Sequence, residues 1–196
     1  MRSVRKLALS ALVIGLTGAL VSAVTFSAFS SISQNASNRV QTGSVTIGDN
    51  DAGAAMLSLV SAVPAASSTG CIRTTYTGSL NSELRLYGAV SGVLAQYLTL
   101  TVTRGSDSAP SFSSCANFSA DSTDYLGQGA GVVYRGALAS YPATWGSGIV
   151  DPLAGTPETW TTGEAHSYRF NVTLDDNIGA EGQSATASFT WEARNT

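Results

Sequence analysis

The chain has 196 residues and a formal net charge of −3, and 43% of its residues are hydrophobic. This length suffices for one domain with a buried core. The acidic balance argues against a nucleic acid partner, since phosphate binding requires a basic surface.

Residues 1–28 are typical of an export signal. Three basic residues stand within the first six positions, and residues 7–24 are small or apolar and uncharged. This pattern predicts a cleaved signal peptide, with a retained N-terminal membrane anchor as the alternative. Small residues permit cleavage after Ala23 or between Ala28 and Phe29. The second site leaves residues 29–196 with seven arginines, thirteen acids, no lysine and a net charge of −6, which excludes lysine-based cross-links.

The segment 29–47 separates the signal from the rest of the chain. Residues 29–38 are rich in Ser and Asn and lack periodicity, so we expect them to be unpaired in an isolated subunit. Val45 and Ile47 alternate with polar residues, which predicts a strand.

Alternation with a period of two predicts six or seven strands in all. After residue 47 the residues that mark one face of each strand are Leu57, Leu59 and Val63; Ile72, Thr74 and Tyr76; Leu84 and Leu86; Leu98, Leu100 and Val102; the even positions of 168–174; and the odd positions of 185–191. Residues 105–122 and 145–162 are predicted loops, and the best helix candidate, 125–141, contains four glycines that disfavour a stable helix. The sequence predicts an all-β single domain over 29–196, an antiparallel β-sandwich or jelly roll with long loops and little helix.

The chain has two cysteines, Cys71 and Cys115. In an exported protein such a pair predicts a disulfide, with two free thiols as the alternative. Closing a loop of about 44 residues would stabilise the fold by roughly 4 kcal/mol.

No catalytic residue, metal site or cofactor is predicted. His166 is the sole histidine, and Glu164 is the nearest acid. A zinc hydrolase generally needs three protein ligands, so we expect a surface histidine at the start of a strand. The acidic stretches 49–51 and 175–177 lack the pattern of a calcium loop and are predicted turns. Trp145 and Trp160 fall in predicted loops, where they would cover the edge of the core or bind a sugar.

Several short motifs, in order along the chain, resemble the TasA/camelysin family of exported biofilm matrix fibre proteins. They are T-F-S-A before F-S at residues 25–30, V-Q-T-G-S-V from Val40, T-Y-T-G-S from Thr75, and F-T-W-E-A from Phe189. The resemblance favours cleavage between Ala28 and Phe29 by the signal peptidase associated with that family. Two features depart from it: Phe is usual in place of Val40, and the family does not generally depend on a disulfide.

The resemblance implies a secreted structural protein of the extracellular matrix or cell surface that forms fibres with itself or a related subunit. Contact with a membrane would come only through an uncleaved signal peptide. In such fibres an extended segment of one subunit would pair with an open sheet edge of the next. The predicted donor is 29–47, and its inserted side chains are those of Phe29, Ile32, Val40, Val45 and Ile47. The alternative is that residues 40–47 form the first strand of their own domain in a monomeric surface or matrix protein. Camelysin-like members are catalogued as metallopeptidases, so a secreted metalloendopeptidase is the alternative.

Overall fold

The computed structural model describes residues 30–33, 44–59, 62–151 and 159–196. The predicted signal peptide and its cleavage site between Ala28 and Phe29 lie outside these residues. Within the described ranges, no helix has the length and apolar character that crossing a membrane requires.

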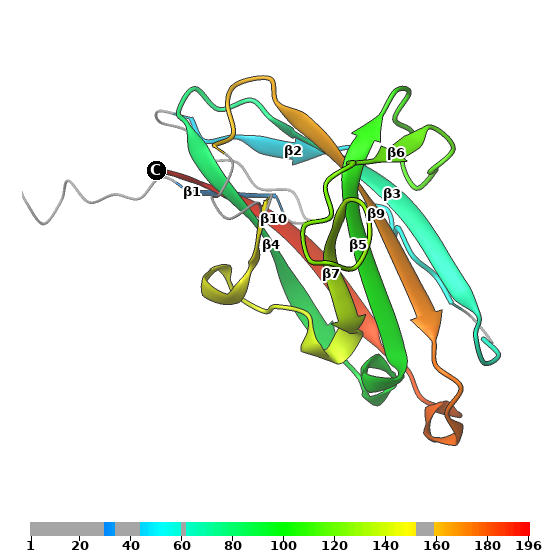
Figure 1. Cartoon of the computed structure of the whole chain (residues 1–196). Helices are drawn as coiled ribbons and strands as arrows, with labels where there is room; N and C mark the ends of the chain where they lie inside the picture. Colours follow the sequence, from blue (N-terminus) through cyan, green and yellow to red (C-terminus); the bar gives the residue numbers. More distant parts are fainter. Residues whose placement is uncertain (1–29, 34–43, 60–61, 152–158) are drawn as a thin grey trace, which may run out of the picture.

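Two antiparallel sheets pack face to face, which confirms the predicted all-β sandwich (Figure 1). The smaller sheet has the order β1-β10-β4-β8. Its strands are β1 (Ser30–Ser33), β4 (Ser82–Ser91), β8 (Ile149–Asp151) and β10 (Thr186–Asn195).

The larger sheet has the order β2-β3-β9-β5-β6, and β7 also pairs with β5. Its strands are β2 (Ile47–Asp49), β3 (Ser67–Tyr76), β5 (Leu98–Asp107), β6 (Phe118–Ala120), β7 (Val132–Ala137) and β9 (Ala165–Leu174). The described residues also form four 3-10 turns: η1 (Val93–Tyr97), η2 (Leu138–Ser140), η3 (Trp145–Ser147) and η4 (Ile178–Ala180).

The core is built from alternate residues of the long strands, as their period of two predicts. In β5, Leu98, Leu100 and Val102 are buried while the intervening threonines are half-buried. Across the two sheets, Phe170 of β9 packs against Phe189 and Trp191 of β10, with ring centroids 4.5 and 5.8 Å apart. These aromatic contacts join the sheets at the centre of the sandwich.

The structure corrects several predicted elements. The stretch around Leu57 and Leu59 is not a strand; its side chains pack against the core from a loop. The predicted loops contain the short strands β6 and β8, and the helix candidate 125–141 contains β7 and η2 instead. Short strands escape detection because three residues show no clear alternation.

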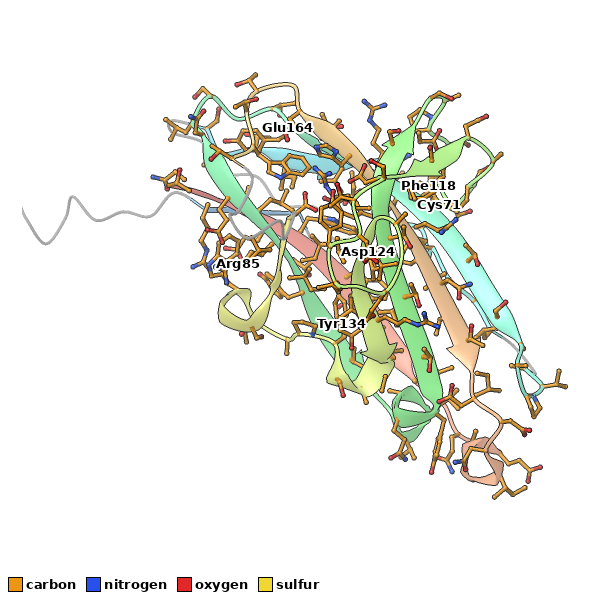
Figure 2. All side chains as sticks on the ribbon, in the orientation of Figure 1. Cys71, Arg85, Phe118, Asp124, Tyr134 and Glu164 are labelled. Carbon is orange, nitrogen blue, oxygen red and sulfur yellow. A yellow bond between two sulfur atoms is a disulfide. The ribbon has the colours of Figure 1, made fainter. Side chains whose placement is uncertain are left out.

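Cys71 and Cys115 form the predicted disulfide, with their Cα atoms 5.2 Å apart. Cys71 lies within β3, on the opposite face from the core residue Ile72, and the loop that carries Cys115 covers it. Near the bond, the Cys71 amide donates to the Ser113 carbonyl, and the Arg169 guanidinium stacks over the Phe118 ring at 5.0 Å (Figure 2). The disulfide therefore fastens the β5–β6 loop across the outer face of the larger sheet.

Candidate functional site

The N-terminal segment contributes the edge strand of the smaller sheet. In β1, Ser30 lies opposite Arg194 and Ser33 lies opposite Trp191, antiparallel to the end of β10. Residues 30–33 are thus paired within their own chain, which differs from the expectation of an unpaired segment. The physical reason is that the edge of β10 offers backbone partners to any extended chain that reaches it.

The predicted donor residues have different places. Ile32 lies in β1, opposite Glu192, while Phe29 and Val40 lie outside the described residues. Val45 and Ile47 are 8% and 6% exposed and belong to the core of their own domain.

Backbone pairing holds the start of the domain body in place. Ile47 pairs with Tyr76 in the β2–β3 ladder, and the Ser44 carbonyl accepts a hydrogen bond from the Ser79 amide. The segment from Ser44 onward therefore serves its own fold, contrary to the expectation that Val45 and Ile47 insert into a neighbour.

Half of the outer edge of β10 lies beyond the reach of β1. On one side β10 pairs with β4 along its whole length, from Thr186 opposite Ser91 to Asn195 opposite Ser82. On the other side β1 pairs with residues 191–194, and no described strand pairs with residues 186–190. A row of backbone groups at a sheet edge is a template for another extended segment.

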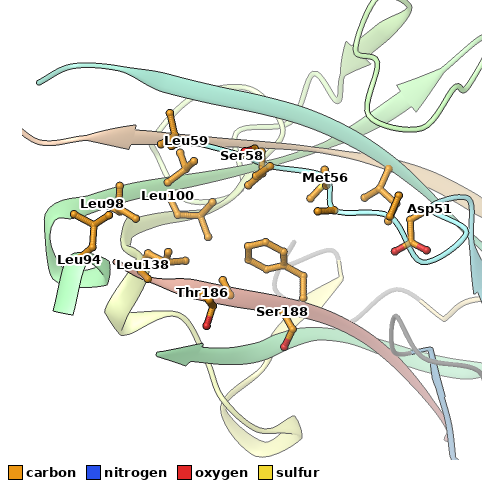
Figure 3. A pocket seen from close by; sticks show the side chains of 18 of the residues that line it. Asp51, Met56, Ser58, Leu59, Leu94, Leu98, Leu100, Leu138, Thr186 and Ser188 are labelled. Atoms are coloured by element: carbon orange, nitrogen blue, oxygen red, sulfur yellow. The ribbon is translucent and has the colours of Figure 1, made fainter. Parts of the chain in front are cut away.

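A hollow opens between the two sheets beside this edge. It has a volume of about 280 Å³ and is lined mainly by apolar side chains. Leu98, Leu100 and Leu138 surround it together with Met56 and Leu59, which come from the loop before β3, and Thr186 and Ser188 lie along its β10 side (Figure 3). An extended segment paired with residues 186–190 could direct alternate side chains into this hollow.

A second group of polar side chains lies between the sheets and centres on Arg104 of β5, which is 5% exposed. Its Nε atom lies 3.1 Å from Oδ1 of Asp151, a fully buried residue at the end of β8. Its Nη1 atom donates to Asp121 and to the Tyr125 hydroxyl, and Nη2 lies 2.8 Å from Nε2 of His166. The Arg104–Asp151 pair thus links the two sheets.

The strand period carries a signal for this cluster that the sequence prediction did not use. Arg104 is in phase with Leu98, Leu100 and Val102, and Asp151 is in phase with the buried Ile149. A charged residue on the core-facing phase of a strand indicates a buried ion pair.

Burial raises the pKa of Asp151 to about 6, and Arg104 and His166 act in the opposite direction. The loss of hydration disfavours the charged carboxylate more strongly than the nearby guanidinium favours it. Burying this ion pair therefore carries a large desolvation penalty. Its chief effect is that removal of either partner alone destabilises the fold strongly.

Glu164 and His166 do come together, with His166 Nε2 3.1 Å from Glu164 Oε1. His166 is half-buried rather than a surface residue, because Trp160 packs against its ring at 4.8 Å. The Arg104 guanidinium places a permanent positive charge beside the same Nε2 atom, which opposes binding of a cation there. Among the described residues, no three His, Cys, Asp or Glu side chains form a group suited to a metal ion.

The other polar candidates have local roles. Asp51 Oδ1 accepts from the Gly53 amide and Asn177 Oδ1 from the Gly179 amide, which are turn interactions. Trp160 is fully buried in the core, and the Trp145 ring lies 4.4 Å from the Arg194 guanidinium.

Neither a protein-family model nor a curated protein sequence matches this chain.

Proposed function

We propose that this chain is an exported structural protein of the extracellular matrix whose subunits join into fibres by exchange of the N-terminal strand. The observation that carries the proposal is the edge of β10, which pairs with β1 over four residues and continues beside an apolar hollow. A disulfide-bonded β domain is compatible with an extracellular location.

Exchange between subunits would allow more strand pairing than the isolated subunit makes. In the observed register, residues 34–38 of a longer strand would lie opposite residues 190–186 of β10. Each added cross-strand pair is worth roughly 0.2–1 kcal/mol. Side chains directed into the hollow would add burial of apolar surface.

The chain is too short to make this longer pairing within one subunit. Ser44 lies beside Ser79, near the end of β10 where Asn195 pairs with Ser82. Thr186 is at the other end of β10, roughly 30 Å away at about 3.3 Å per strand residue. Six Cα–Cα steps separate residue 38 from Ser44 and reach at most about 21 Å. A strand that pairs with the whole edge must therefore come from a second subunit.

Head-to-tail donation of this kind does not close on itself, so it produces filaments. The donor in the proposal is the part of the chain before Ser44, including Phe29, Ile32 and Val40. Val45 and Ile47 stay in the core of their own domain.

Deletion of residues 29–38 tests the proposal. The truncated protein should stay folded, with a thermal midpoint near that of protein that starts at Phe29, because β1 is a short edge strand. It should fail to form filaments in electron micrographs at concentrations where the longer protein forms them. A peptide of residues 29–43 should slow growth of the intact protein by competing for the β10 edge.

Point variants of Ile32 separate the loss of backbone pairing from the change of side chain. Ile32→Pro removes a backbone N–H and should impair growth more strongly than Ile32→Thr, which keeps the N–H and the strand propensity and loses only part of the apolar side chain. Unchanged filament growth of the truncated protein would refute strand exchange. Unfolding on truncation would instead make residues 29–38 part of the domain's own core.

A further inference from the structure

The end of the sandwich where β10 begins carries unusually exposed apolar side chains. Ile178 in η4 is 81% exposed, Val63 is 67% exposed, and Val93 at the start of η1 is 56% exposed. They are the most exposed of the large hydrophobic residues that the structure describes. Such a concentration of apolar surface at one end is typical of an interaction site.

A hollow of about 580 Å³ lies at the same end, with Val63 and Ile178 in its lining. Backbone hydrogen bonds hold its walls together. The Ala65 amide donates to Leu174, the Leu94 amide to Ser184, and the Asp175 amide to Tyr97, over 2.9 to 3.2 Å. The loops that line the hollow are thus fastened to one another, and one of them carries η4, which lies at the lower right of Figure 1.

The direction of strand pairing decides what would cover this end. β1 runs antiparallel to β10, so a donated strand passes from Arg194 toward Thr186 as its residue number rises. After residue 38 the donor chain would leave the acceptor at the Thr186 end and reach its own Ser44 within six residues. The body of the donor subunit would therefore stand against the end that carries Val63 and Ile178.

We infer that this apolar end is a second contact between subunits, which receives the end of a second copy of this chain that carries Ser44. The inference rests on the proposed strand exchange and adds a separate surface to it. Asp175, Asp176 and Glu181 border the hollow, and the predicted secreted chain has a net charge of −6. Added salt should therefore promote the contact by screening repulsion between subunits.

Ile178→Glu tests this surface, with Leu126→Glu as the matched control. Leu126 is 40% exposed and lies in the β6–β7 loop, away from the hollow. Because both side chains are exposed, both variants should keep the thermal midpoint and the affinity for the 29–43 peptide. The critical concentration for filament growth, measured by sedimentation, should rise at least about tenfold for Ile178→Glu and stay within about twofold for Leu126→Glu.

A fluorescent label gives an independent measurement, since the structure shows no free cysteine among the described residues. An environment-sensitive dye on an Ile178→Cys variant should shift its emission to the blue on assembly, and the same dye on Leu126→Cys should not. Equal critical concentrations for the two glutamate variants, or no shift at position 178, would overturn the end contact and leave strand exchange intact. Filament growth that survives deletion of residues 29–38 would overturn both.

Discussion

Replacing Arg104 with Met should destabilise the fold strongly, and the loss should depend on pH. Arg104 is 5% exposed and Asp151 is fully buried, with 3.1 Å between Arg104 Nε and Asp151 Oδ1. Methionine fills much of the same space but leaves Asp151 without this cation. Removing one partner of a buried ion pair costs about 3–5 kcal/mol, because the other charge stays buried.

The pH dependence follows from the pKa of Asp151. Burial raises this pKa to about 6 while Arg104 acts to lower it, so loss of Arg104 should raise it further. At pH 7.5 the variant must then bury an unpaired carboxylate or bind a proton. At pH 5 the carboxyl group is already largely protonated, and the difference from the unaltered protein should be smaller.

Urea unfolding at pH 5 and pH 7.5 measures both effects. Arg135→Met is the control, because Arg135 is exposed and the same change there should cost less than about 0.5 kcal/mol. Adding Asp151→Asn to Arg104→Met should recover part of the stability at pH 7.5 by removing the buried charge. The reasoning is refuted if Arg104→Met costs no more than the Arg135 control at pH 7.5, or costs the same at both pH values.

Three further changes test other parts of the structure. The pKa of Asp151 is about 6 in the folded protein instead of the ordinary 3.8, so the free energy of unfolding should fall by about 3 kcal/mol as the pH rises from below 4 to above 6. Asp151→Asn should abolish this pH dependence, as measured by urea unfolding. Changing both Cys71 and Cys115 to Ala should lower the free energy of unfolding by roughly 4 kcal/mol, and a reducing agent should then have no further effect on the thermal midpoint. Ile47→Ala should cost about 2–5 kcal/mol in the monomer, whereas no loss would mean that Ile47 is not part of its own core.

The alternation of apolar and polar residues was enough to predict five of the long strands and their buried faces. It succeeded in β3, β4, β5, β9 and the end of β10 because a strand places successive side chains on opposite faces, whatever its neighbours are. The disulfide could also be predicted from the sequence, since two cysteines allow one pairing. The same alternation was misleading at Leu57 and Leu59, whose side chains pack inward although their backbone forms no strand.

The candidate site depended on information that alternation does not contain. Which strands become neighbours is decided by backbone pairing between segments far apart in the chain. On the edge of β10 that faces away from β4, this pairing leaves residues 186–190 without a described partner strand. The fold class, the core faces of the long strands, the cysteine pair and the distinct N-terminal segment could therefore be predicted from the order of the residues alone. The packing of the two sheets was needed to show that Val45 and Ile47 belong to their own core, that Arg104 lies beside Asp151, and that part of the β10 edge has no described partner strand on its outer side.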